Sequence, residues 1–283
     1  MFSRLILSIA LSFPALAQQN PDWVKPFPPF KILGNIHWVG TWDLSTYLIT
    51  TPQGHILINT GLAETVPQIK ANVELLGFKL SDVKILTATH AHSDHVAGMA
   101  ELKRMTGAKM IMSERDSELL ENGGKTDFRW GDMVHTLFPP VKVDQKLKES
   151  QKISLGGTEL TIHIHPGHTK GATSFTLDVR EGGKTYRVVI ANMASVNPGV
   201  NLKGMARYPG IAEEYARTFQ DQKQMKIDVW LASHAAQFKL HEKYQPGATY
   251  NPERFVDPVG FHSAVERLEK IYVDQLAIDR KAQ

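Results

Sequence analysis

The chain has 283 residues, of which 42% are hydrophobic and 22% charged, an ordinary composition for a globular protein with one well-packed core. Its formal net charge of +3 is too small, and its lysines and arginines too scattered, to indicate a nucleic-acid binder. Cysteine is absent, which excludes disulfides, thiolate nucleophiles and thiolate metal ligands. Whatever chemistry occurs here must use oxygen and nitrogen.

The first residues have the pattern of a secretory signal peptide. An apolar stretch over residues 5–15 leads to Ala15-Leu16-Ala17, a small-x-small cleavage site. We expect cleavage after Ala17 and a periplasmic or secreted protein, with residues 18–283 as a single domain of two pseudo-equivalent halves. A buried helix or a membrane anchor is the alternative, but Pro14 and the short apolar run argue against a spanning helix. No stable membrane association is expected.

The first half of the mature chain alternates short strands with helices. Its lead, residues 21–30, is rich in Pro and aromatic residues (Trp and Phe) and is expected to lie as extended chain over the surface. The β-type runs that follow are 31–39, 45–51, 55–59, 84–89 and 109–112. The predicted helices are 64–76, 96–105 and a short one capped by Ser113.

The second half repeats this pattern. Its predicted strands are 158–164, 173–179, 186–191 and 229–232, and its predicted helices are 211–225 and a terminal one that starts at Ser263, with Glu266 completing a capping box. The longest irregular stretch is 123–140, whose aromatic residues suggest a mobile rim over a site. Strands followed by helices in both halves predict an α/β (α+β) fold of two sheets covered outside by helices.

One loop carries an unusual density of metal-competent side chains. His90, His92, Asp94 and His95 follow directly after the buried strand at 84–89. Packing does not explain four such side chains in six positions, and HxHxDH is a specific motif. His90 and His92 alternate onto one side while the backbone is extended, and Asp94 and His95 then lie in the turn that enters the next helix. This loop can therefore face two metal positions.

Two further histidines lie just beyond strand ends, where functional groups collect on layered α/β folds. His168 lies in the tight turn 165–171, and His234 follows the apolar strand at 229–232. A lone histidine at a strand end is more often a surface or hydrogen-bonded residue. Beside the upstream motif, both become candidate ligands. The other histidines lack such contexts; His165 is the main exception, because it is close to His168.

The sequence resembles the metallo-β-lactamase superfamily. The resemblance rests on the strand and turn at 56–61, the HxHxDH motif, the PGHTxG turn at 166–171 and the final histidine. It implies a four-layer αββα sandwich with the metal site at one edge of the two sheets. It also implies two zinc ions, one held by His90, His92 and His168 and the other by Asp94, His95 and His234.

Within the superfamily the sequence is similar to subclass B3. The similarities include His95 in a chain without cysteine, Val39-Gly40-Thr41, and Val196-Asn197-Pro198-Gly199. Glyoxalase-type and lactonase-type relatives bridge both metals with an Asp on the strand after the PGH turn, but residues 188–195 hold no carboxylate. Met193 stands where many B3 enzymes have a Ser, and Asn59 where many relatives have an Asp.

The resemblance implies a zinc-dependent hydrolase that opens the β-lactam ring of penicillins, cephalosporins and carbapenems by attack of metal-bound hydroxide. Asp94 would be the catalytic residue that orients the nucleophile, and Ser195 and Asn197 would contact the substrate carboxylate. We expect a monomer acting on a small molecule. The alternatives are a hydrolase of the same fold acting on lactones or thioesters, and a non-catalytic exported zinc-binding protein.

Overall fold

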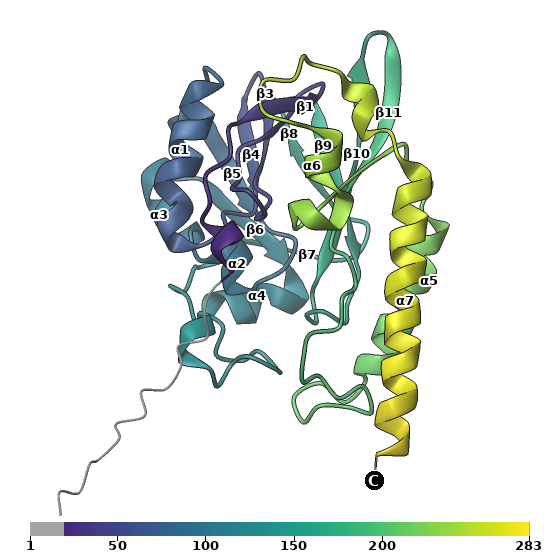
Figure 1. Ribbon diagram of the computed structural model, residues 1–283. Coiled ribbons are helices and arrows are strands. Elements are labelled where there is room, and N and C mark those ends of the chain that lie inside the picture. Colours follow the sequence, from purple (N-terminus) through teal and green to yellow (C-terminus); the bar gives the residue numbers. More distant parts are fainter. Residues whose placement is uncertain (1–19, 283) are drawn as a thin grey trace, which may run out of the picture.

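The structure is a computed structural model that describes residues 20–282 (Figure 1), so the predicted signal peptide lies outside the described residues. Its strands form a seven-stranded sheet in the order β1 to β7 and a five-stranded sheet in the order β12-β11-β10-β9-β8. The first sheet contains β1 (Phe30–Leu33), β2 (Ile36–Trp38), β3 (Tyr47–Thr51), β4 (Gly54–Ile58), β5 (Val83–Thr87), β6 (Lys109–Ser113) and β7 (Gln145–Leu147). The second contains β8 (Lys152–Leu155), β9 (Thr158–Ile164), β10 (Thr173–Glu181), β11 (Lys184–Ala191) and β12 (Val229–Ala232).

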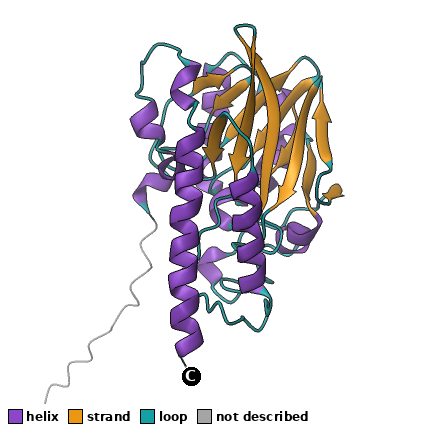
Figure 2. Cartoon of the chain, turned by 90° about the vertical axis from the view of Figure 1, so that its right-hand side faces the viewer, coloured by secondary structure: helices purple, strands orange, loops and turns teal. Residues whose placement is uncertain are grey.

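Helices cover the outer faces of both sheets (Figure 1, Figure 2). They are α1 (Val66–Leu75), α2 (Ser93–Val96), α3 (Met99–Thr106), α4 (Glu114–Glu121), α5 (Ile211–Gln224), α6 (Leu240–Lys243) and α7 (Pro258–Lys281). Helices α1 and α3 lie outside the first sheet, and α5 packs against α7 outside the second. Within the described residues, no helix combines the length and apolarity needed to cross a membrane.

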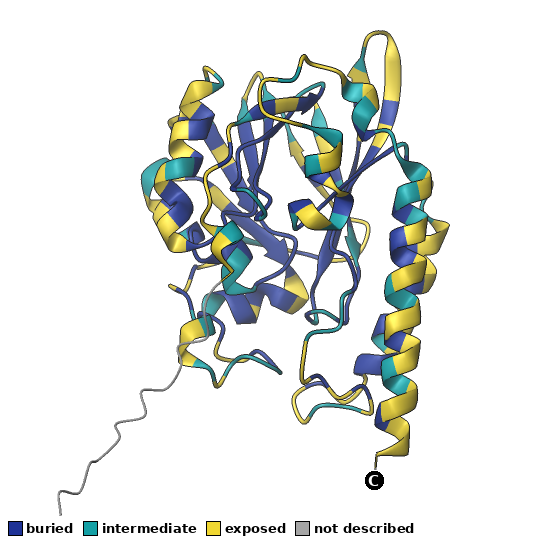
Figure 3. Cartoon of the chain, viewed as in Figure 1, coloured by how far each residue is buried: buried dark blue, intermediate teal, exposed yellow. Residues whose placement is uncertain are grey.

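The side chains of β4 show why two cores form. Successive residues of a strand point to opposite faces of a sheet. Ile56 and Ile58 enter the core between the two sheets, whereas Leu57 enters a second core shared with α1 and α3. Both cores are buried and the exposed residues collect on the outer helices (Figure 3). The arrangement confirms the predicted αββα sandwich.

The two halves meet at one edge of the sheets. Strands β4 and β5 are parallel neighbours in the first sheet, as β11 and β12 are in the second. The loops after β5, β9, β11 and β12 all reach this edge. Thr173 N donates to Thr89 O at 2.7 Å and Ser233 Oγ donates to Thr89 Oγ1 at 2.9 Å, so one residue joins the halves.

Most predicted elements are confirmed to within a few residues. Strands 158–164 and 229–232 match β9 and β12 at both ends, and helix 64–76 corresponds to α1. Ser113 caps α4 as predicted, its hydroxyl accepting from Asp116 N. The stretch 123–140 is irregular apart from one short turn of 3-10 helix. The sequence analysis did not predict β7 and β8, which are short.

Three boundaries were predicted wrongly, each for a local reason. The run 31–39 is a hairpin, because Gly34 turns the chain with φ of +54° where a Cβ would meet Val179. The helix at 96–105 is divided between α2 and α3 at Gly98, where a Cβ would lie 2.9 Å from Thr60 O. The terminal helix starts at Pro258 rather than Ser263. Its N-cap is Asp257, whose carboxylate accepts from Gly260 N.

Candidate metal centre

Two side chains hold the HxHxDH loop at the sheet edge by accepting hydrogen bonds from its backbone. Asn59 Oδ1 accepts from Thr89 N at 2.9 Å and from Thr89 Oγ1 at 3.2 Å. Ala91 N donates to Asp116 Oδ2 at 3.1 Å. His92 is still extended and forms the N-cap of α2, so the chain turns into that short helix between His92 and Asp94. The strand-to-helix turn therefore directs the loop's side chains to two neighbouring positions.

The structure brings His168 to the first two histidines of the motif. The ring centroids of His90 and His92 lie 4.7 Å apart, those of His90 and His168 4.7 Å apart, and those of His92 and His168 4.9 Å apart. One nitrogen from each ring lies within 4.8 Å of one nitrogen of the others. These three histidines could hold a metal ion.

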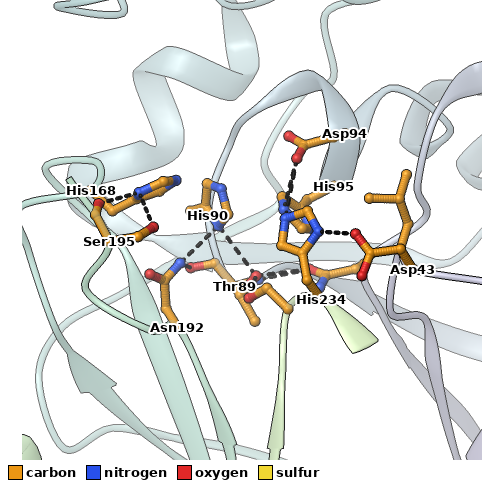
Figure 4. A network of polar contacts seen from close by, with 12 residues as sticks. Asp43, Thr89, His90, Asp94, His95, His168, Asn192, Ser195 and His234 are labelled. Atoms are coloured by element: carbon orange, nitrogen blue, oxygen red, sulfur yellow. Dashed lines mark hydrogen bonds and ion pairs between the residues drawn. The ribbon is translucent and has the colours of Figure 1, made fainter. Parts of the chain in front are cut away.

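A second compact group adjoins the first. It consists of His90, Asp94 and His95, with the rings of His90 and His95 4.3 Å apart. His234 stands beside this group: its Nε2 lies 3.4 Å from Asp94 Oδ2 and its ring 4.9 Å from that of His95. His90 thus lies between two sets of donors, and all six predicted ligands gather in one place. Figure 4 labels five of them, all except His92.

Each imidazole of the first set is held from behind by a group on a different element. His92 Nε2 lies 3.2 Å from Asp127 Oδ2, and His168 Nδ1 donates to Ser195 O at 2.9 Å. His90 Nδ1 contacts the side-chain amide of Asn192 at 2.7 Å (Figure 4). Groups that bind one ring nitrogen fix the orientation of the other. The ring nitrogens not held this way are left for a shared ligand.

In the second set, a carboxylate supports His234. His234 Nδ1 lies 3.0 Å from Asp43 Oδ2, and Asp43 Oδ1 accepts from Ala236 N at 3.1 Å. Burial lowers the pKa of His234, but Asp43 and Asp94 outweigh it and raise that pKa to about 9. The loop after β12 is thereby tied to the loop after β2.

Burial and neighbouring charges set the ionisation of the donors. Burial lowers the pKa of His168 to about 3 and holds that of His90 well below its ordinary value, so both rings are neutral and offer lone pairs. Burial raises the pKa of Asp94, but His95 and His234 outweigh it and hold that pKa well below its ordinary value. Asp94 is therefore a carboxylate among imidazoles.

Buried donor atoms without a partner indicate where a metal fits. In the described part of the chain, His90 Nε2 and His95 Nδ1 are buried without a hydrogen bond, and His95 Nε2 has only Asp94 Oδ2, itself a predicted ligand, at 3.2 Å. Such atoms are costly unless a ligand completes them. Imidazoles and a carboxylate are ligands that zinc accepts in tetrahedral sites with an open position. The donor set therefore fits zinc.

The other predicted site residues lie nearby with different surroundings. Ser195 is behind His168: its carbonyl accepts from His168 Nδ1, and its hydroxyl is 3.3 Å from the same atom. Asn197 is partly buried in the same loop. Met193 is buried in the core between the sheets. His165 is a buried structural residue, since its Nδ1 contacts Ser174 Oγ at 2.7 Å.

Sequence reasoning missed the residues that support the ligands. Asp43, Asp127 and Asn192 carry no motif of their own, and their roles depend on contacts between distant segments. The lead at residues 21–30 reaches the site as well, with the ring of Trp23 6.0 Å from that of His234. It was predicted to lie extended over the surface, but it begins with a 3-10 helix at Pro21–Trp23 and buries Phe27 and Phe30 in the core. Its aromatic residues were the available signal.

Comparisons with known proteins agree with this geometry. The model of the metallo-beta-lactamase superfamily matches residues 39–182. A beta-lactamase from Chitinophaga pinensis is 43% identical with a TM-score of 0.90, over 94% of this chain and 100% of that one. A class B3 di-zinc metallo-beta-lactamase from an Alaskan soil metagenome is 44% identical with a TM-score of 0.89, over 93% of this chain and 98% of that one.

A curated relative with another name matches a shorter region. A hydroxyacylglutathione hydrolase of Cereibacter sphaeroides is 33% identical over 112 residues, which is 40% of this chain. The chain spans about a third of the length of that relative, 34%. The two lactamase structures, in contrast, match nearly the whole chain. The chain therefore belongs to the metallo-β-lactamase superfamily, with subclass B3 enzymes among its near structural neighbours, and it is a hydrolase.

Proposed function

We propose that the protein is a zinc-dependent β-lactam hydrolase that opens the ring of penicillins, cephalosporins and carbapenems. The observation that carries this proposal is the gathering of five imidazoles and one carboxylate at the sheet edge. The high identity to class B3 lactamases over almost the whole chain supports the substrate class. The absence of a carboxylate in residues 188–195 counts against a glyoxalase-type or lactonase-type centre.

In this proposal the six donors hold two zinc ions. His90, His92 and His168 bind one ion, and Asp94, His95 and His234 bind the other. Bound zinc would supply Lewis acidity, which polarises a carbonyl and lowers the pKa of a water molecule towards neutrality. The backbone and side-chain groups behind the imidazoles keep the donor nitrogens oriented.

The chain's own residues have distinct tasks in the reaction. Asp94 remains ionised, and its Oδ2 lies close to His95 and His234. From there it orients the attacking water and accepts hydrogen bonds from it. Ser195 and Asn197, in the loop after β11, contact the carboxylate of the substrate. Trp23 offers an aromatic ring near His234.

A substrate panel tests the proposed chemistry. We expect the zinc-loaded protein to hydrolyse a penicillin, a cephalosporin and a carbapenem, and a chelator to abolish all three activities. A lactone and a glutathione thioester belong in the same panel, because the curated relative is named for a thioester hydrolase. Faster hydrolysis of the thioester than of every β-lactam would replace the lactamase assignment. Tight zinc binding without any hydrolysis would favour a non-catalytic zinc protein.

We also propose that the mature protein is an exported monomer of one domain, cut after Ala17. The small-x-small site at Ala15-Leu16-Ala17 supports the cleavage point. Intact-mass measurement of protein from the periplasm and from the medium tests it. Light scattering during gel filtration tests the monomer. A mass that retains residue 1, or a dimer at low micromolar concentration, would contradict this proposal.

A further inference from the structure

Two loops beside the metal centre hold each other through arginines. Residues 122–144 connect α4 to β7, and residues 192–210 connect β11 to α5. Arg129 in the first loop donates from Nε to Pro198 O in the second at 2.7 Å. Arg207 in the second loop donates from Nη1 to Asp127 O in the first at 3.1 Å. We call these two reciprocal hydrogen bonds the arginine clasp.

Neighbouring residues accommodate the clasp and add a second contact between the two loops. Gly199 has φ of +79°, which favours glycine, and the Arg129 guanidinium lies against it: a Cβ there would be 2.7 Å from Nη2 and would displace the guanidinium. Phe128 packs edge-on against Tyr208 with ring centroids 5.0 Å apart, adding an apolar contact between the same loops. The clasp is therefore a packed junction between the loops.

Asp127 links the clasp to a proposed metal ligand. Its carbonyl accepts from Arg207, while its carboxylate Oδ2 lies 3.2 Å from His92 Nε2. Its Oδ1 accepts from Arg129 N at 2.7 Å and from Trp130 N at 2.6 Å. Asp127 is only 4% exposed. The backbone that the clasp holds is thus the backbone that places this carboxylate.

We propose that Arg207 is a positioning residue for the first zinc ion. It fixes the peptide of Asp127 and so keeps the Asp127 carboxylate on His92, which orients the imidazole. This inference rests on the proposed function only in taking His92 as a zinc ligand. It makes no use of the identity of the substrate.

The direction in which zinc affinity changes when Arg207 is removed distinguishes a positioning role from a purely electrostatic one. Arg207 carries a positive charge near a cation site, so removing it should strengthen zinc binding on Coulombic grounds. Loss of orientation at His92 should instead weaken it. Arg115 provides a matched control: it lines the same pocket of about 390 Å³ as Arg207, and its guanidinium pairs with Glu214 at 2.7 Å rather than with the loop.

The experiment measures zinc affinity by competition with a chromophoric chelator, using the full chain. We expect Arg207→Ala to weaken zinc binding on the order of threefold to tenfold, which is about the effect of one lost hydrogen bond. Asp127→Asn should weaken it roughly 10- to 100-fold, as for direct partners of metal-bound histidines. Arg115→Ala should bind zinc as tightly as the unmodified chain or more tightly.

A further variant isolates the hydrogen bond to the Asp127 carbonyl. Arg207 Nη2 also pairs with exposed Asp132 at 3.0 Å. Asp132→Asn removes that ion pair alone and should leave zinc affinity within about twofold, because exposed pairs contribute little. Arg207→Lys keeps the positive charge but loses the planar guanidinium with its several N–H donors. Its zinc affinity should fall between those of Arg207→Ala and the unmodified chain. Arg207→Lys also decides the matter if Arg207→Ala does not fold.

Three results would overturn the positioning role. They are unchanged or tighter zinc binding in both Arg207 variants, an equal loss in Arg115→Ala, and no zinc binding by the unmodified chain. The last would also remove the proposed function. Zinc binding without β-lactam hydrolysis would remove only the substrate assignment, and the affinities of the variants would still support or refute the clasp.

Discussion

The two halves of the metal centre differ in how the protein prepares them. In the set of His90, His92 and His168, every imidazole is held from behind by a protein group on another element. In the set of Asp94, His95 and His234, only His234 has such a support, the carboxylate of Asp43. Among the described residues, His95 Nδ1 has no hydrogen bond, and His95 Nε2 has only Asp94 Oδ2, a member of the same set, at 3.2 Å.

This difference indicates in which set the orientation of the side chains depends on a bound metal ion. A ligand set that is already oriented loses less conformational freedom when an ion binds. The fold therefore orients the imidazoles of the first set before an ion binds. In the proposed centre a bound ion would complete the second set, because among the described residues no group on another element orients the ring of His95. The comparison leads to four predictions, given in order of decreasing effect.

The largest effect is expected when the best-prepared set loses a donor. His168→Ala should remove the first zinc ion and lower β-lactam hydrolysis by more than the roughly 100-fold upper cost of losing a supporting group. His163→Ala is the matched control, because His163 contacts Thr176 Oγ1 on β10 and lies outside both groups of donors. Metal analysis together with the hydrolysis rate checks this. Equal loss in both variants would show a general effect of removing histidine.

A tenfold to hundredfold loss of affinity for the second zinc ion is expected when Asp43, which supports His234, is changed. Asp43→Asn should weaken binding of the second zinc ion roughly 10- to 100-fold, since the amide is a poorer partner for His234. Binding of the first ion should stay within about twofold, because the two supports touch different rings. A two-step zinc titration of the variant measures both affinities. A parallel loss at both steps would refute the division into separately supported sets.

The sequence allowed prediction of the ligands but not of this difference between the sets. His90, His92, Asp94 and His95 lie in one short loop, so local geometry limits where they can point. Strands of period two and a PGH turn were enough to bring His168 to the same edge. Asp127 and Asn192 act across gaps of 35 and 102 residues in the sequence, which local rules do not address.

Two errors in the fold have a different origin, because the deciding signals are local. Leu33 pairs with Ile36 across Gly34-Asn35, a two-residue hairpin turn with φ of +54° at Gly34, and this signal was overlooked within the run 31–39. Ser263 with Glu266 has the pattern of a capping box, but Asp257 followed by Pro258 is the stronger start and begins the helix earlier. A turn residue and a competing cap, rather than hydrophobic pattern, decided these positions.

A smaller effect is expected in the order of filling. With one equivalent of zinc, the prepared set should fill first, with an affinity at least about tenfold above that of the second set. Histidine side-chain NMR can follow this, because the signals of His92 and His168 should change before those of His95 and His234. Simultaneous change of all four would show that the supports do not separate the affinities.

The smallest effect separates a backbone support from a side-chain support within the first set. His168 Nδ1 donates to the carbonyl of Ser195, which every residue type retains, whereas His90 depends on the side chain of Asn192. Ser195→Ala should therefore leave zinc affinity within about twofold, and Asn192→Ala should lower it by more, up to roughly tenfold. If the Ser195 hydroxyl also contacts the substrate carboxylate, Ser195→Ala should raise KM for a β-lactam while kcat changes little. A marked loss of zinc from Ser195→Ala would instead show that its hydroxyl, 3.3 Å from His168 Nδ1, is the group that holds the ring.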